Sequence, residues 1–210
     1  GEAQAGGVTK EAGDIDLVAE AVAVEAAGGR DDDLVALGFL EFVGERFGED
    51  MVDDIIEVSA LPSGGAYTSV GTYSHGEMAA LCGALAERTQ QPVGELVRDF
   101  GVRLSDTFAR DFPDFFRRAG NLFDFLESIE AHIHIEVLKL YPDAELPRFT
   151  VEERSAARMV LLYTSPRKMG HLSEGLILGS AQHYNVEVRV ALEMLDVEEG
   201  MSTRFVIELV

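Results

Sequence analysis

Apolar residues recur every three or four positions through the N-terminal part of the chain, which is the period of a helix that buries one side. Gly48 follows the first such segment and predicts a helix stop. Ser74 and Glu77 have the spacing of a capping box and predict where the third segment begins. Gly101 and Pro113 are expected to interrupt the later helices. The segments predicted to be helical are 34–47, 50–61, 74–89, 92–100, 105–116 and 121–140.

The segment 121–140 opens on Asn121, a residue type that favours the N-cap of a helix. Its apolar stripe predicts one uninterrupted helix, which ends before Pro142 because a residue that precedes proline avoids the helical conformation. The same helix carries His132 and His134, which face different sides because they are only two positions apart. The stripe consists of Leu122, Leu126, Ile129, Ile133, Val137 and Leu140.

After residue 147 the apolar and polar residues alternate, which is the period of a strand with one buried face. Helices first, and then antiparallel strands with one inserted helix, indicate the α+β class. We therefore expect an N-terminal helical subdomain followed by an antiparallel sheet. Strands are predicted at 148–154, 157–164, 185–195 and 203–210, a helix at 168–184 and a hairpin turn at 196–202.

Residues 1–33 differ in composition from the rest of the chain. Residues 1–13 are rich in Gly and Ala, and 28–33 are polar and rich in Gly and Asp. Between them, 15–27 is an Ala, Val and Glu run that suits a short helix. Two interpretations stay open, a partly ordered tail or a helix that packs on the domain or on a partner. We place the domain at 34–210 and treat 1–33 as an extension of unknown role.

Composition narrows the class of protein. The chain has 210 residues, 47% of them hydrophobic, which is enough for one sizeable core. Its 17 basic and 38 acidic residues give a net charge of −21, and so acidic a surface repels nucleic-acid phosphates and anionic membranes. The single cysteine, Cys82, excludes an internal disulfide and fits a reducing cytoplasm. No apolar run approaches membrane-spanning length and no secretory signal pattern is present, so we expect a cytoplasmic protein.

Three polar side chains, Tyr163, Ser165 and Arg167, would share one face of a strand-like run. A guanidinium grips a carboxylate through two hydrogen bonds, and hydroxyls beside it add further donors. Such a row next to apolar residues suits a flat, apolar ligand with carboxylate tails. Haem has that shape, and the helical His134 could supply an axial ligand to its iron. The alternative is a half-exposed strand with three solvated polar groups.

Tyr-x-Ser-x-Arg at 163–167, with a histidine and prolines upstream, resembles the H-NOX (haem nitric-oxide/oxygen binding) family, which includes the haem domain of soluble guanylate cyclase. In that family the ligand histidine lies seven residues before a Tyr-Pro pair and thirteen before a second proline. His134 meets both counts, with Tyr141 opening the pair and Pro147 as the second proline, and His132 meets neither. The similarity extends over residues 34–210. The stretches that carry it are 37–42, 45–48, 108–116, 134–149 and 163–175.

The resemblance implies a haem b held between the two subdomains, with His134 as the iron ligand. Pro147 would press on one haem face, although an ordinary loop proline is equally compatible with the sequence. The propionates would be bound by Tyr163, Ser165 and Arg167.

The side of the haem opposite the histidine decides which gas binds. Oxygen-binding members of the family carry a hydrogen-bonding tyrosine five residues after the arginine, and here that position is Leu172. An apolar Leu172 favours nitric oxide and carbon monoxide, which gain less than O2 from a hydrogen-bond donor. The neighbouring His171 is a rival donor, although adjacent helical positions diverge by about 100°. Further candidates for the apolar wall, each equally compatible with ordinary core packing, are Val35, Phe39, Phe108, Phe112 and Leu138.

These features predict a haem-based gas sensor for nitric oxide and carbon monoxide, and not an enzyme. In the family, nitric oxide weakens the bond between iron and histidine. Release of His134 would then shift the two subdomains, and a partner in trans, such as a histidine kinase or a diguanylate cyclase, would read that shift. Two alternatives stay open. One is an oxygen or redox sensor or a haem enzyme, and the other is a haem-free interaction module.

Overall fold

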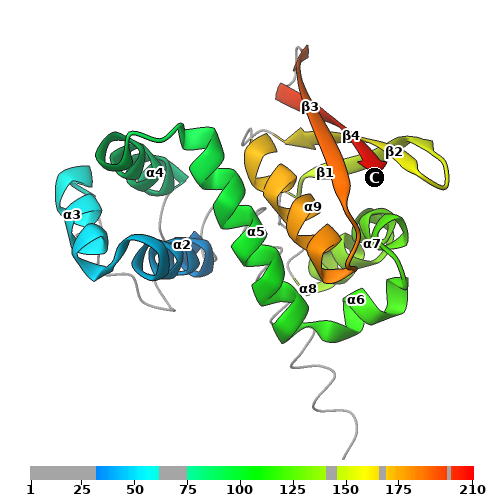
Figure 1. Cartoon of the computed structure of the whole chain (residues 1–210), viewed down its shortest axis with the longest axis horizontal. Coiled ribbons are helices and arrows are strands. Elements are labelled where there is room, and N and C mark those ends of the chain that lie inside the picture. Colours follow the sequence, from blue (N-terminus) through cyan, green and yellow to red (C-terminus); the bar gives the residue numbers. More distant parts are fainter. Residues whose placement is uncertain (1–31, 62–74, 141–145, 166–168, 198–199) are drawn as a thin grey trace, which may run out of the picture.

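The computed structural model describes residues 32–61, 75–140, 146–165, 169–197 and 200–210. Figure 1 shows a lobe of helices on one side, a lobe that contains a sheet on the other, and a long helix, α5, between them. The helical lobe consists of α2 (Asp32–Phe47), α3 (Glu49–Ser59) and α4 (His75–Thr89), which lead into α5 (Val93–Asp111). The second lobe contains α6 (Pro113–Ala119), α7 (Leu122–Ser128), the π-helical turn η1 (Ile129–Ile133), α8 (His134–Leu140) and α9 (Gly170–His183).

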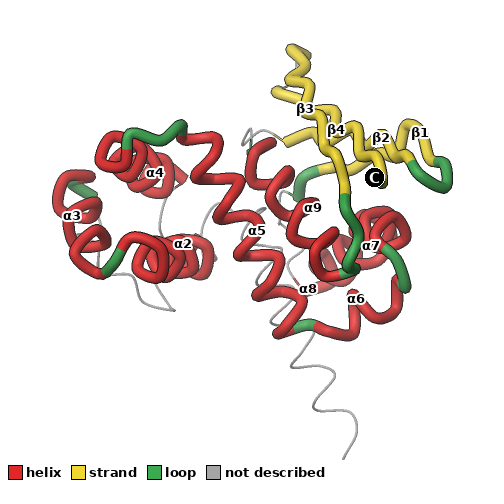
Figure 2. Tube along the Cα trace, in the orientation of Figure 1, coloured by secondary structure: helices red, strands yellow, loops and turns green. Residues whose placement is uncertain are grey.

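The sheet consists of β1 (Arg148–Arg154), β2 (Arg158–Ser165), β3 (Val188–Val197) and β4 (Gly200–Leu209). Its strand order is β1-β2-β4-β3, and every neighbouring pair is antiparallel. The strand trace is drawn in yellow in Figure 2. Buried and less buried residues alternate along most of β2, which shows that one face of the sheet packs against the interior. The α+β class and the order of elements predicted from the sequence are therefore confirmed.

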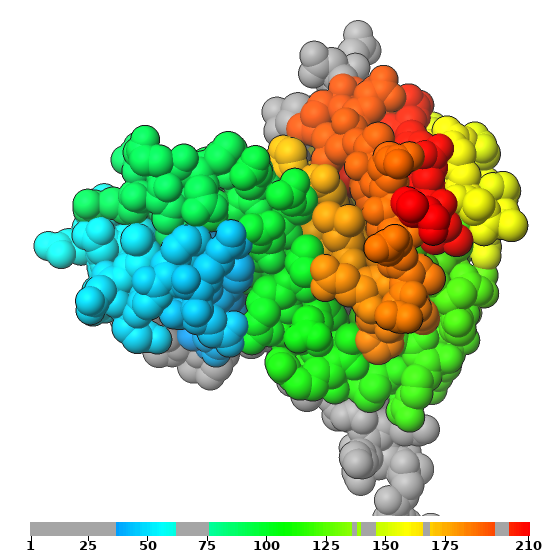
Figure 3. All heavy atoms as spheres, viewed as in Figure 1, coloured from blue at the N-terminus to red at the C-terminus, as the bar shows by residue number. Residues whose placement is uncertain are grey.

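Among the described residues, buried apolar side chains form two clusters, and α5 and α9 contribute to both. The helical core contains Phe39, Leu40, Phe42, Val43, Ile55, Leu61, Leu81, Cys82, Ala84, Leu85, Leu96, Phe100 and Leu172. The sheet core contains Ala109, Phe116, Leu122, Phe123, Phe125, Leu126, Ile133, Met159, Leu161, Tyr163, Ile177, Ala181, Phe205 and Ile207. In the space-filling view of Figure 3, the N-terminal helices and the strands lie on opposite sides of the molecule, with α5 and α9 between them.

The predicted break at Gly101 is wrong, because α5 continues through it. A side chain at Gly101 would place its Cβ 2.5 Å from the backbone oxygen of Leu172 on α9. Gly179 is equally tight, with its Cβ position 2.6 Å from the Cβ of Ser105. These glycines serve the close approach of two helices, which local sequence signals do not reveal. The break at Pro113 is confirmed, since α6 begins there.

Two further predictions need correction, and two others concern residues outside the described ranges. The helix expected at 121–140 is divided by the π-helical turn η1. The hairpin turn expected at 196–202 is shorter, because β3 extends to Val197 and β4 begins at Gly200. The capping residue Ser74 and the short helix expected at 15–27 lie outside the described residues. In the described ranges, no helix is long and apolar enough to cross a bilayer.

Candidate functional site

The polar row on β2 is buried. Tyr163 is 0% exposed and Ser165 is 2% exposed, and both lie on the inward face of β2 with Met159 and Leu161. A buried hydroxyl is costly unless it is hydrogen-bonded, so these groups are placed for a partner and are not solvated. This excludes the half-exposed alternative for Tyr163 and Ser165. Arg167 lies outside the described residues.

His134 opens α8 and is only 4% exposed, whereas His132 is exposed. The Nδ1 of His134 lies 3.1 Å from the Oε2 of Glu130. Burial lowers the pKa of His134, and the charge and hydrogen bond of Glu130 oppose this only in part. The ring is therefore neutral at pH 7, with its Nδ1–H donated to the carboxylate and a lone pair left on Nε2.

The π turn directs His134 into the core. In an uninterrupted α-helix, with about 100° per residue, His134 would lie about 80° away from the buried Leu126. The π turn, in which the backbone N–H of His134 donates to the carbonyl of Ile129, holds one more residue than an α turn. Every residue after it therefore lags by about 100°, which brings His134 to within about 20° of Leu126. Sequence reasoning missed this turn.

Phe149 on β1 connects the histidine to the polar row. Its ring centroid lies 5.9 Å from that of His134 and 5.3 Å from that of Tyr163, the residue directly opposite it on β2. Pro147, two residues earlier, is buried. The structure thus gathers His134, Phe149, Tyr163 and Pro147 at one place, where α8 meets the beginning of β1.

The candidates for the apolar wall fall into two groups. Leu172 and Phe39 lie together in the helical core and are 2% and 0% exposed. Phe108 and Phe112 pack instead on the edge of the sheet core, with ring centroids 6.4 Å apart. Leu138 is 42% exposed. The side chain of Val35 lies outside the described residues.

Two polar neighbours of Leu172 differ in their surroundings. His171 is about half exposed, and its Nδ1 lies 3.3 Å from the Oε2 of Glu174. Ser173 is 1% exposed, and its Oγ has no hydrogen-bond partner among the described residues. Ser173 shares a helix face with Gly170, which abuts Thr203 of β4, so its hydroxyl is on the side of α9 that meets the sheet. The sequence offered no signal for Ser173.

This donor set fits haem. A buried neutral imidazole provides one nitrogen, two buried hydroxyls lie on the inner face of β2, α9 carries one unsatisfied hydroxyl, and apolar cores flank them. The described residues contain no cluster of three or more His, Cys, Asp or Glu side chains that could hold a bare metal ion. A model of the haem-NO-binding family matches residues 34–192. The chain belongs to this family.

Solved structures agree with the assignment. The unliganded Fe(II) H-NOX protein from K. algicida is 36% identical to this chain, with a TM-score of 0.77. The match covers 85% of this chain and 96% of the K. algicida chain. Two more distant structures support the fold alone. The Fe(II)NO H-NOX protein from S. oneidensis is 24% identical, with 85% and 98% coverage and a TM-score of 0.74. A mutant of the T. tengcongensis H-NOX protein is 23% identical, with 83% and 94% coverage and a TM-score of 0.73.

No curated protein matches the chain. H-NOX domains are haem-based gas sensors and are generally not enzymes, which agrees with the class expected from the sequence. Glu130 was absent from the residues predicted for the site. Its position four residues before His134 was the available signal, because side chains at that spacing meet on a helix.

Proposed function

We propose that this H-NOX chain holds haem b between its two lobes through His134, and that it senses nitric oxide and carbon monoxide rather than O2. Bound haem would supply a ferrous iron with one free side for a diatomic gas. The observation that supports the selectivity is Leu172, which is buried among apolar side chains of the helical core. A leucine has no hydrogen-bond donor, and O2 gains more from such a donor than nitric oxide or carbon monoxide does.

His134 has the properties of the axial ligand. It is buried, so solvent does not compete for its ring, and it is neutral, so Nε2 keeps its lone pair. The hydrogen bond to Glu130 fixes the tautomer in which Nε2 is the free nitrogen. His132 is exposed and has no such environment.

The propionates would be bound by Tyr163 and Ser165, together with Arg167. The buried hydroxyls of Tyr163 and Ser165 point to the same side of β2, as two donors to one carboxylate pair require. Pro147 would contact the haem face next to His134. Phe39 would join Leu172 in the apolar wall, with Val35, Phe108, Phe112 and Leu138 as outer contacts.

The readout would be a partner protein in trans, such as a histidine kinase or a diguanylate cyclase, and the chain itself would have no enzymatic role. The single free thiol, Cys82, is compatible with a reducing cytoplasm as the place of action. A charge of −21 gives no support to nucleic acid or an anionic membrane as the partner.

One observation favours oxygen sensing as a second candidate. The unpartnered hydroxyl of Ser173 follows Leu172 directly and could donate to a bound gas. If so, Ser173→Ala would weaken O2 binding and leave nitric-oxide binding nearly unchanged. If Ser173 instead faces a propionate, the same variant would weaken haem retention without changing gas selectivity.

The first test is the absorption spectrum of the reduced protein with nitric oxide, with carbon monoxide and in air. We expect a haem band that shifts with nitric oxide and carbon monoxide and does not change reversibly with O2. A reversible change with O2 would replace the proposed selectivity with oxygen sensing. If no haem band appears even after haem supplementation, a haem-free interaction module would be the remaining hypothesis.

Substitutions test the residues. His134→Ala should abolish the spectrum of the histidine-ligated form, and His132→Ala should leave it nearly unchanged. Leu172→Tyr should improve O2 binding, while Leu172→Phe, which adds a ring without a hydroxyl, should not. Equal behaviour of the two Leu172 variants would show that this side chain does not face the gas.

A further inference from the structure

Three acidic side chains, Asp124, Glu127 and Glu130, lie three residues apart along α7 and η1 and face strand β1. The carboxylates of Asp124 and Glu127 both contact the guanidinium of Arg154, near the end of β1. Glu130 accepts a hydrogen bond from the backbone N–H of Phe149, near the beginning of β1, at 3.2 Å. These contacts fasten the strand to the helix along its length.

Glu130 differs from the other two carboxylates because one of its oxygens has two partners. The same Oε2 that accepts from Phe149 N also accepts from the Nδ1 of His134, at 3.1 Å. Since β1 is an edge strand, an N–H that points away from β2 needs a partner outside the sheet, and Glu130 is that partner. Phe149 also contacts the His134 ring directly, with centroids 5.9 Å apart.

We propose that Glu130 is the positioning residue of His134 and that it joins the position of the imidazole to strand β1. The inference rests on the proposed function, because it concerns the role of His134 as the axial ligand. A carboxylate on Nδ1–H sets the ring orientation and raises the basicity of Nε2. Because one oxygen serves both donors, a shift of the ring changes the acceptor available to Phe149 N.

The π turn makes this arrangement specific to this segment. It turns His134 into the core, while Glu130, whose side chain is 45% exposed, stays at the surface above β1. Glu127, one turn earlier, has the same charge and faces the same strand, yet it contacts Arg154 instead of His134. Glu127 is therefore a matched control for Glu130.

The experiment compares the wild type with Glu130→Ala, Glu130→Gln and Glu127→Ala. The readouts are the iron–histidine stretching band of the reduced protein by resonance Raman, haem affinity by transfer to apomyoglobin, and hydrogen exchange of the Phe149 amide by NMR. We expect Glu130→Ala to lower the band, to weaken haem binding about tenfold and to speed Phe149 exchange about tenfold. Glu130→Gln, which keeps an acceptor oxygen, should show smaller changes than Glu130→Ala in all three readouts.

Glu127→Ala should destabilise the fold without moving the iron–histidine band. An unchanged band in Glu130→Ala, or an equal shift in Glu127→Ala, would overturn the inference while leaving the proposed function intact. If Glu130→Ala does not fold, the iron–histidine band of Glu130→Gln takes its place as the test. An unshifted band in Glu130→Gln would then overturn the inference. A wild type that takes up no haem would overturn both proposals, and Phe149 exchange in the apoprotein would then still test the bond to Glu130.

Discussion

Cys82 lies on the buried side of α4, where it is 4% exposed within the helical core. Burial raises the pKa of its thiol to about 12, because the charged thiolate would lose its hydration. The reactive species is the thiolate, so the folded protein holds this cysteine in an inert form. Cys82 is therefore a packing residue of the helical core.

At pH 8 only about one thiol in 10⁴ would be ionised in the folded state, given a pKa of about 12. We expect iodoacetamide to leave Cys82 unmodified in native protein and to alkylate it once urea unfolds the chain, with mass spectrometry as the readout. Rapid alkylation of the native protein would contradict the buried placement.

The same shift makes stability depend on pH in the alkaline range. The pKa of Cys82 is higher in the folded state, about 12, than in an unfolded chain, about 8.5, so the folded state binds the proton more tightly. Stability should therefore be full below pH of about 8.5 and fall as the pH rises toward 12. In urea titrations over this range, Cys82→Ala should lose less stability than the wild type, and parallel losses would contradict the assignment.

At the scale of elements, the contact of α5 with α9 depends on glycines. A Cβ at Gly175 would overlap the carbonyl oxygen of Arg98, whereas a Cβ at Gly83 on α4 would meet nothing within 4 Å. The two glycines are both helical and differ mainly in this respect. Their substitution by alanine therefore separates packing from helix propensity.

Gly175→Ala should destabilise the protein by about 1–3 kcal/mol or more, because the two helices must move apart. Gly83→Ala should instead stabilise it by about 0.5–1 kcal/mol, through helix propensity alone. Urea unfolding followed by circular dichroism measures both. Equal effects of the two substitutions would mean that α5 and α9 do not pack as closely as described.

The π turn η1 is the element on which the histidine depends. Ala131 lies within it and is exposed, so its deletion removes the extra residue without opening the core. The turn should then revert to α-helix and leave His134 within about 20° of Leu126, because seven α-helical positions amount to about 700°. We therefore expect a folded protein by circular dichroism that keeps the histidine-ligated haem band, as Ala131→Ser should. Loss of the band in the deletion variant alone would mean that the wider turn does more than set the direction of His134.

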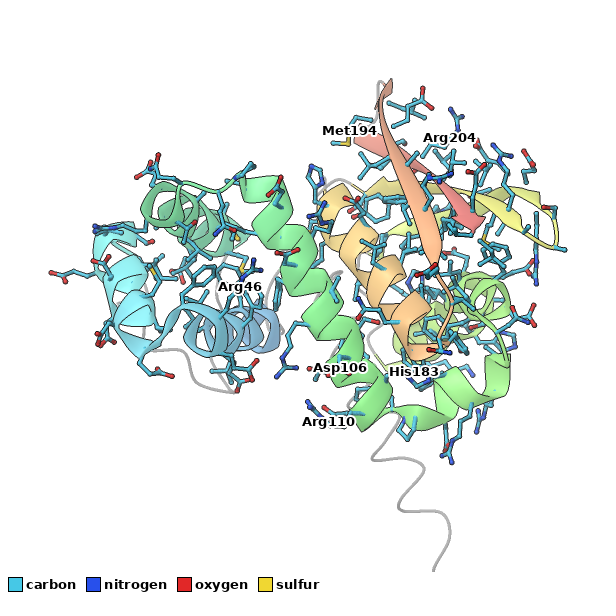
Figure 4. The ribbon with its side chains drawn as sticks, viewed as in Figure 1. Arg46, Asp106, Arg110, His183, Met194 and Arg204 are labelled. Carbon is cyan, nitrogen blue, oxygen red and sulfur yellow. The ribbon has the colours of Figure 1, made fainter. Side chains whose placement is uncertain are left out.

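At the scale of the whole molecule, two electrostatic effects oppose each other. Ion pairs connect elements within the helical lobe and within the sheet, while the net charge opposes compactness. Figure 4 shows Arg46, which reaches from α2 to Asp99 of α5, and Arg204 on the sheet. Arg204 of β4 contacts Glu152 of β1 at 2.6 Å and Glu193 of β3 at 3.1 Å, so it links both edge strands of the sheet. Exposed pairs of this kind contribute about 0–1 kcal/mol each.

We expect sodium chloride to raise the melting temperature. A charge of −21 makes self-repulsion among acidic side chains the larger electrostatic effect, and salt screens it. Screening worth about 1 kcal/mol would raise the melting temperature by about 2–4 °C for a chain of this size. Differential scanning calorimetry at low and physiological salt tests this. A lower melting temperature in salt would mean that the surface ion pairs outweigh the repulsion.

The sequence by itself determined the type and order of most elements. Periods of about three and a half and of two residues separate helices from strands wherever one face is buried, and this holds for α3 and for the four strands. Alternation also placed Tyr163 and Ser165 on one face of β2, and their burial confirms it. The preference for His134 over His132 came from the family resemblance, and the difference in burial agrees with it.

Only the tertiary structure decided the features that depend on contacts between distant segments. Gly101 is a helix breaker by local propensity, yet α5 continues through it. The backbone of α9 occupies the space that a side chain at position 101 would fill, so this position requires glycine. An α turn and a π turn at η1 differ little in local signals, and the burial of His134 and the bonds of Glu130 distinguish them. Packing separated Leu172 and Phe39 from the other apolar candidates, because burial energy belongs to the assembled core and not to any segment alone.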